Sequence, residues 1–144
     1  FLYGVEGELR FGLGLFADIL SPVKLVANYT WIQSEVEGAR KRPMQGQSPY
    51  LANVILFFEP FGGRTQISLL YNRFGERISK VGVEGFPDVL ERPRSGLEFS
   101  LSQTLAGGLK SKFTAKNLTD AEVVFTQGGL VTKRTSPGQS YSMF

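Results

Sequence analysis

The stretch Tyr50-Leu-Ala-Asn-Val-Ile-Leu-Phe-Phe-Glu59 decides the fold of this chain. Every second residue from Tyr50 to Phe58 is apolar, and Asn53 and Glu59 stand on the other face among apolar neighbours. Because successive side chains of a strand point to opposite faces, this period of two predicts a β-strand. Its apolar run, Val54 to Phe58, is far shorter than the ~20 residues that a transmembrane helix needs.

The same period recurs along most of the chain. Leu97 to Ser102 alternates strictly between apolar and polar residues, and residues 5–11, 23–31 and 109–116 follow the same pattern. We therefore predict seven strands, at about 2–14, 22–36, 49–59, 64–80, 94–105, 109–126 and 130–144.

The predicted connections alternate in length. Tight turns are expected at 18–22, 60–63 and 106–108, where Gly62-Gly63 and Gly107-Gly108 are turn formers. Longer polar loops are expected at 37–49 and 81–94, and a short connection at 127–129. Short turns on one side and longer loops on the other are typical of outer-membrane barrels.

The fold class predicted is all-β, an antiparallel transmembrane β-barrel segment. A soluble antiparallel sheet with one buried face is the alternative, since it shares the alternation. Long strands and the lack of a predicted helix to cover the apolar face count against that alternative. The residues assigned to the lipid face and its aromatic girdle are Tyr29, Trp31, Tyr50, Val54, Leu56, Phe58, Leu97, Phe99, Leu101 and Phe113. Those assigned to the barrel lumen are Glu6, Glu8, Arg10, Asn53, Glu98, Lys110, Lys112 and Lys116.

The charged residues suggest few specific sites. We expect the lumen charges to pair across adjacent strands. Arg40, Lys41 and Arg42 are candidates for contact with an anionic ligand or lipopolysaccharide phosphates, although a solvated basic loop is the favoured explanation for them. Asn117 and Asp120 are expected at a turn or strand end.

Composition argues against several functions. The 144 residues include no cysteine and no histidine, so thiolate sites and a Ser-His arrangement are excluded within this chain. We expect no enzymatic activity, cofactor or metal site. The net charge is +3 with no long basic block, so we expect no nucleic-acid partner.

Several segments resemble TonB-dependent outer-membrane receptors. Four segments are similar to that family's strand segments and stand in family order: Leu25-Val-Ala-Asn-Tyr-Thr-Trp-Ile-Gln-Ser-Glu35, Gly46-Gln-Ser-Pro-Tyr-Leu-Ala-Asn53, Leu70-Tyr-Asn-Arg-Phe-Gly-Glu-Arg-Ile78 and Ala115-Lys-Asn-Leu-Thr-Asp120. Pro87-Asp-Val-Leu-Glu-Arg-Pro-Arg94, followed by Leu97 to Gln103, resembles the hairpin between the last two.

The resemblance implies a plugged barrel of about 22 strands in the bacterial outer membrane. Residues 1–144 would be its C-terminal part, without the plug domain. Its partners would be membrane lipid and lipopolysaccharide, the rest of the barrel and plug or another chain, and TonB through the missing N-terminal region. Since single-chain bacterial barrels have even strand numbers, seven strands must be completed by others.

Three functions remain open at this point. The first is TonB-driven import of a scarce nutrient of the siderophore, cobalamin, glycan or peptide class. The second is a receptor-like barrel that serves as a structural or docking subunit of a larger outer-membrane complex. The third is a soluble β-sheet binding module.

Overall fold

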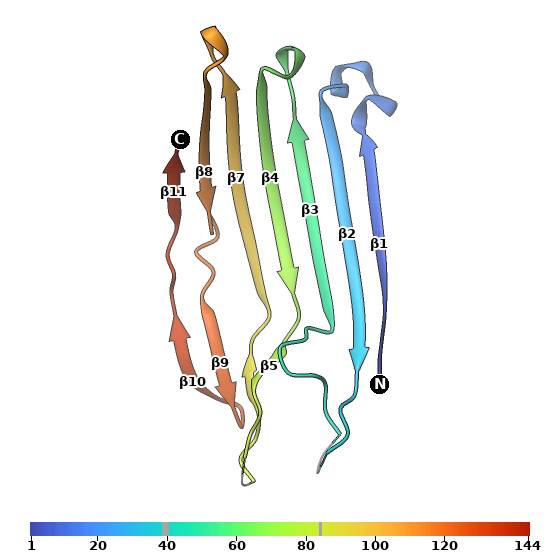
Figure 1. Ribbon diagram of the computed structural model, residues 1–144, viewed down its shortest axis with the longest axis vertical. Coiled ribbons are helices and arrows are strands. Elements are labelled where there is room, and N and C mark those ends of the chain that lie inside the picture. Colours follow the sequence, from blue (N-terminus) through green and yellow to red (C-terminus); the bar gives the residue numbers. More distant parts are fainter. Residues whose placement is uncertain (39–40, 84) are drawn as a thin grey trace.

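The chain forms two antiparallel β-sheets (Figure 1). A computed structural model describes residues 1–38, 41–83 and 85–144. The larger sheet has seven strands in the order β1-β2-β3-β4-β7-β8-β11, and the smaller has four in the order β10-β9-β6-β5. The described residues form no helix with the length and apolar character to span a membrane. The predicted all-β class is confirmed.

The seven-stranded sheet contains most of the long strands. Its members are β1 (Leu2–Gly12), β2 (Val23–Ser34), β3 (Tyr50–Phe58), β4 (Thr65–Phe74), β7 (Arg94–Thr104), β8 (Lys110–Lys116) and β11 (Ser140–Met143). The four-stranded sheet is made of β5 (Arg77–Lys80), β6 (Val89–Glu91), β9 (Val123–Gln127) and β10 (Leu130–Thr135).

Three predicted strands are each divided between the two sheets. The predicted strand 64–80 is β4 and β5, 109–126 is β8 and β9, and 130–144 is β10 and β11. Between β8 and β9 the chain turns at Asn117 and Asp120, whose φ angles are 54° and 48°. The side-chain oxygen of Asn117 accepts a hydrogen bond from the amide of Ala121 at 2.9 Å, so the predicted turn role of Asn117 is confirmed.

The predicted loop 81–94 was wrong in part, because it contains strand β6. β6 pairs with both β5 and β9. The predicted first strand is also too long, since β1 ends at Gly12 and the chain continues into a 3₁₀ turn. Alternation alone does not show where a strand leaves one sheet and enters another.

The connections divide the seven-stranded sheet into two ends. At the turn end lie the 3₁₀ turns η1 (Leu13–Leu15), η2 (Asp18–Leu20), η3 (Phe61–Gly63) and η4 (Ala106–Gly108). In η3, Gly62 and Gly63 have φ angles of 66° and 80°, a region that residues with a Cβ rarely adopt. The predicted glycine turns are confirmed. At the loop end lie residues 35–38 and 41–49 and the four-stranded sheet (Figure 1).

The molecule has almost no interior. Among the described residues, the buried apolar side chains are Phe74, Ile78 and Ala115. The accessible surface is 9812 Å², whereas a compact monomer of 15.9 kDa exposes roughly 7,400 Å². No described element packs against either face of the larger sheet over its length (Figure 1). The fold is therefore a single layer whose two faces are both open.

Candidate functional site: two faces of the seven-stranded sheet

The strand register places alternate residues of every strand on the same face across the whole seven-stranded sheet. Residues directly opposite each other in an antiparallel pair lie on the same face. Val54 lies opposite Ala27 on β2 and Tyr71 on β4, and Tyr71 lies opposite Leu97 on β7. The same parity continues through β8 to β11, so the alternation of each strand adds up to two distinct faces.

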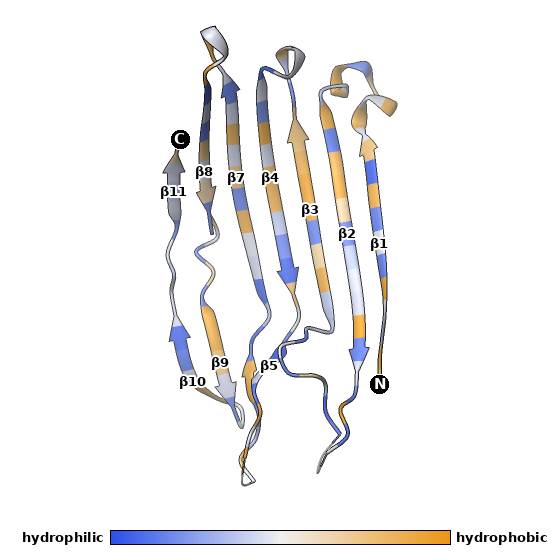
Figure 2. Ribbon diagram, viewed as in Figure 1, coloured by the Kyte–Doolittle hydropathy of each residue, from blue (hydrophilic) through white to orange (hydrophobic). Residues whose placement is uncertain are grey.

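One face is apolar from β1 to β11, and Figure 2 shows the alternating bands along the strands. We call it the apolar face. Its members include Tyr3, Val5, Leu9, Phe11, Val23, Leu25, Ala27, Tyr29, Trp31, Tyr50, Ala52, Val54, Leu56, Phe58, Ile67, Leu69, Tyr71, Leu97, Phe99, Leu101, Phe113, Ala115, Tyr141 and Met143. All ten residues assigned to the lipid face lie on it.

Aromatic side chains border the apolar face at the loop end. The rings of Tyr29 and Tyr50 are 6.3 Å apart, and those of Tyr3 and Trp31 are 5.7 Å apart. The next residue on this face beyond Tyr71 is Arg73, so charge begins where the aromatic row ends. Aromatic side chains at such a boundary are typical of membrane–water interfaces.

The apolar face is more exposed than the opposite face on the central strands. Val54 and Leu56 are each 38% exposed and Leu69 is 40% exposed. Ile55 and Leu70 adjoin these residues in the chain but lie on the other face. They are half-buried and therefore less exposed. Side chains on the convex side of a bent sheet spread apart and become more accessible. The pattern therefore indicates that the sheet bends with its apolar face outward.

The opposite face, which we call the polar face, carries all the residues assigned to the lumen. They are Glu6, Glu8, Arg10, Asn53, Glu98, Lys110, Lys112 and Lys116. Amide and hydroxyl side chains join neighbouring strands on this face. Asn53 donates to Asn28 at 2.7 Å and accepts from Asn72, and the hydroxyls of Ser68 and Ser100 are 2.8 Å apart.

The expected pairing of Glu8, Arg10 and the three lysines of β8 across adjacent strands is not found among the described residues. Glu8 pairs with Arg10 on its own strand. Within the described part of the chain, Lys110, Lys112 and Lys116 have no carboxylate within the 4.0 Å of an ion pair. In the β7–β8 ladder Lys110 lies opposite Thr104 and Lys112 opposite Ser102, whereas Glu98, which lies opposite Leu70 of β4, lines the same hollows as Lys116 without an ion pair to it.

The polar face carries an apolar island that was not predicted from the sequence. Val26, Ile55 and Leu70 lie in one row across β2, β3 and β4, and Phe57 lies next to Ile55 on the same face of β3. The signal was present in the uninterrupted run from Val54 to Phe58, because a strand that is apolar at consecutive positions is apolar on both faces.

An ion pair closes the turn end of the polar face. Lys24 Nζ lies 2.6 Å from a carboxylate oxygen of Glu59, and Gln66 donates to the other oxygen at 2.8 Å. These hydrogen bonds, first that from Lys24, lower the pKa of Glu59 below its ordinary value. The pair ties β2 to the β3–β4 turn.

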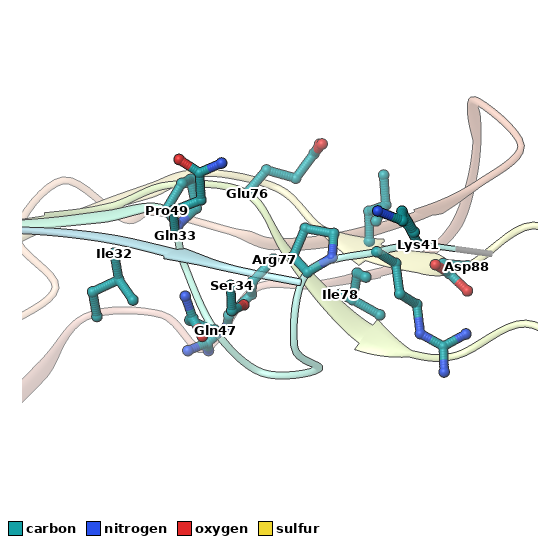
Figure 3. Close-up of a pocket in the computed structure, with 13 residues that line it drawn as sticks. Ile32, Gln33, Ser34, Lys41, Gln47, Pro49, Glu76, Arg77, Ile78 and Asp88 are labelled. Carbon is teal, nitrogen blue, oxygen red and sulfur yellow. The ribbon is translucent and has the colours of Figure 1, made fainter. Parts of the chain in front are cut away.

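A hollow of about 370 Å³ lies at the loop end, between residues 41–49 and strands β5 and β6 (Figure 3). Lys41 and Arg42 line it, but Lys41 Nζ is bound to Glu35 at 2.9 Å and Arg42 pairs through its backbone with Val36. Arg40 lies outside the described residues. The structure thus places two of the three basic loop candidates at a hollow that also has acidic lining from Glu76 and Asp88.

A charged cluster that was not predicted from the sequence lies where the four-stranded sheet meets the larger one. Arg77 Nε donates to Glu91 at 2.8 Å across β5 and β6. The guanidinium groups of Arg77 and Arg94 lie 4.7 Å and 5.6 Å from the ring centre of Phe74. The contact between Arg94 and Phe74 depends on the register of β4 and β7, which the sequence does not reveal, whereas Arg77 follows Phe74 by three residues in the chain.

Within the described residues, no group of three acidic side chains is placed to hold a metal ion. A comparison with protein-family models finds no match, and no curated protein or solved structure matches the chain. The most extended feature of the described residues is the pair of faces of opposite polarity on one open sheet.

Proposed function

We propose that the seven-stranded sheet is a segment of a transmembrane β-barrel in a bacterial outer membrane. The observation that carries the proposal is the apolar face, which runs without interruption across seven strands and is covered by no described element. Lipid tails would solvate such a face favourably, whereas its exposure to water would carry a high cost in free energy.

The dimensions support this proposal. Strand β3 has 9 residues, and its apolar face extends from Tyr50 to Phe58. A tilted strand crosses the hydrocarbon core with ~9–11 residues. The outward bend of the apolar face, the short turns at one end and the larger connections at the other are likewise typical of outer-membrane barrels.

The strand directions support a barrel completed by further strands. In a seven-stranded antiparallel sheet the first and last strands run in the same direction, and β1 and β11 both point toward the turn end (Figure 1). If β1 and β11 paired with each other, that pair alone would be parallel. An antiparallel closure therefore needs an odd number of added strands, such as about 15 in a barrel of about 22.

We propose further that the chain is the C-terminal part of a TonB-dependent receptor, which imports a scarce nutrient. The ordered resemblance of five segments to that family supports this step, and the polar face would then line the interior. The turn end would face the periplasm, and the four-stranded sheet would lie on the extracellular side.

Labelling at two neighbouring positions tests the membrane part of the proposal. The chain has no cysteine, so Asn53→Cys and Val54→Cys each introduce a single thiol, on opposite faces. In phospholipid vesicles, a water-soluble maleimide should modify the thiol at position 53 and spare that at position 54. Equal modification of both in vesicles, after full modification of both in urea, would contradict a lipid-facing sheet.

A genetic experiment separates transport from a docking role. In the native bacterium, deletion of the gene and deletion of TonB should abolish growth on the same limiting nutrient. If deletion of the gene instead dissociates an outer-membrane complex and leaves uptake of every tested nutrient intact, the receptor proposal fails and the docking role replaces it.

A further inference from the structure

The polar face of β8 carries a row of three exposed lysines. Lys110, Lys112 and Lys116, which we call the lysine row, share one side of the strand. None of them has an ion-pair partner within the described residues. Like charges on one strand face repel each other, so a negatively charged occupant would stabilise them.

Three hollows join along this row into one groove. The first, of about 470 Å³, lies at the turn end beside Arg64, Lys110 and Lys112. The second, of about 420 Å³, shares Lys112 with the first and extends to Lys116. The third, of about 300 Å³, shares Lys116 with the second and ends near Arg94. Five cations thus follow one groove, in which Glu98 is the acidic lining residue.

The rest of the lining indicates the kind of occupant. Hydroxyl groups of Ser68, Ser100 and Thr114 offer hydrogen bonds in the middle of the groove. Leu70, at the edge of the apolar island, lines two of the three hollows. A small anion would neutralise the lysines but leave the apolar island exposed to water. A polypeptide can cover charged and apolar side chains together.

The spacing of the row matches an extended peptide. Lys110 and Lys112 are two residues apart on a strand, which is about 7 Å, and Lys116 lies about 14 Å farther. Alternate side chains of an extended peptide repeat at the same distance. We propose that the groove binds an acidic polypeptide segment in extended conformation, with carboxylates on the lysine row and apolar side chains on the island. This goes beyond the proposed function, because it concerns the polar face and does not require transport.

Peptide binding tests the proposal on the full chain in zwitterionic detergent micelles. The probe is fluorescein-labelled octaglutamate, followed by fluorescence anisotropy at low salt, with labelled octaglutamine for comparison. A triple variant with Lys110→Gln, Lys112→Gln and Lys116→Gln should bind octaglutamate at least about tenfold more weakly. A matched variant with Arg10→Gln, Lys41→Gln and Lys133→Gln removes the same charge elsewhere and should change binding less than about twofold.

A second probe tests the contribution of the island. A labelled peptide of alternating Glu and Leu should bind more tightly than octaglutamate, and Leu70→Ser should remove that gain while leaving octaglutamate binding unchanged. The proposal is overturned if the two triple variants weaken binding equally, or if inorganic phosphate at micromolar concentration displaces the peptide. The second result would assign the groove to a small anion.

The result of the peptide-binding experiment does not depend on the membrane proposal. Binding in micelles needs no bilayer, and vesicle insertion of the triple variant is measured separately. Loss of peptide binding with normal insertion supports the groove alone. Normal peptide binding by a chain that fails to insert would contradict the barrel and leave the groove intact.

Discussion

The two sheets of this molecule differ in whether the strand register keeps alternate residues on the same face from one strand to the next. The seven-stranded sheet keeps one parity across all its pairs, so every strand adds to the same apolar face. The four-stranded sheet has short strands, and its register shifts in β5–β6 and again in β9–β10. Continuous parity makes a surface that suits lipid, and the shifts interrupt it in a region held by charged contacts.

The largest expected effect comes from placing a charge in the middle of the apolar face. Val54→Arg should destabilise the chain in vesicles by about 2–4 kcal/mol, because an arginine at the bilayer midplane leaves water for hydrocarbon. The measurement is the free energy of unfolding by urea in phospholipid vesicles.

The adjacent position provides the control for this substitution. Asn53→Arg places the same side chain on the polar face and should cost much less. If Asn53→Arg and Val54→Arg were equally destabilising, the two faces would not differ in their surroundings. That result would contradict a lipid-facing apolar face.

The ion pair between Arg77 and Glu91 should give the next largest effect, confined to the smaller sheet. Its side chains are 35% and 10% exposed, so Glu91→Ala should weaken the β5–β6 hairpin by about 1–2 kcal/mol. Hydrogen exchange of the β5 and β6 amides measures this opening. The exchange of β3 should not change, because β3 belongs to the other sheet.

A second pair in the same region sets the scale. Arg134 and Glu122 are 3.1 Å apart with side chains 60% and 41% exposed. Glu122→Ala should therefore cost less than about 1 kcal/mol. Comparable losses in the two variants would show that burial of the Arg77–Glu91 pair has no influence on the stability of the hairpin.

The smallest effect concerns pH at the turn end. The pKa of Glu59 is lowered in the folded chain by its hydrogen bonds with Lys24 and Gln66. Its contribution to stability is therefore present above the unfolded pKa and is lost as pH falls through the folded pKa. Comparing wild type with Glu59→Gln, the difference in unfolding free energy should be present at pH 7 and disappear in acid. A difference that persists below pH 2 would contradict the assignment.

Much of the larger sheet could be predicted from the sequence because alternation is local. The strands Tyr50–Phe58 and Arg94–Thr104 lie close to their predicted ranges, and the faces of Val54 and Asn53 follow from parity alone. The smaller sheet could not be predicted in this way. Val89–Glu91 is too short to show a period, and its pairing with β9 joins segments far apart in sequence.

The candidate sites show the same limit. Parity places Lys110 and Lys112 together on one face, but only the register shows that their neighbours on β7 are Thr104 and Ser102 rather than a carboxylate. The apolar island likewise forms because Ile55 and Leu70 are opposite each other on different strands. Contacts between strands depend on register, and this chain carries its register in turns and bulges rather than in the alternating residues.

The single tryptophan offers the most direct test of the central claim that the apolar face contacts lipid. Trp31 lies on that face at the loop end and is 39% exposed. In vesicles of brominated phosphatidylcholine its fluorescence should be quenched, most strongly with bromines near the headgroups, and acrylamide should have little effect. A variant with Trp31→Phe and Thr30→Trp, which moves the indole to the polar face, should show the reverse. Acrylamide quenching of Trp31 together with no quenching by brominated lipid would contradict the account.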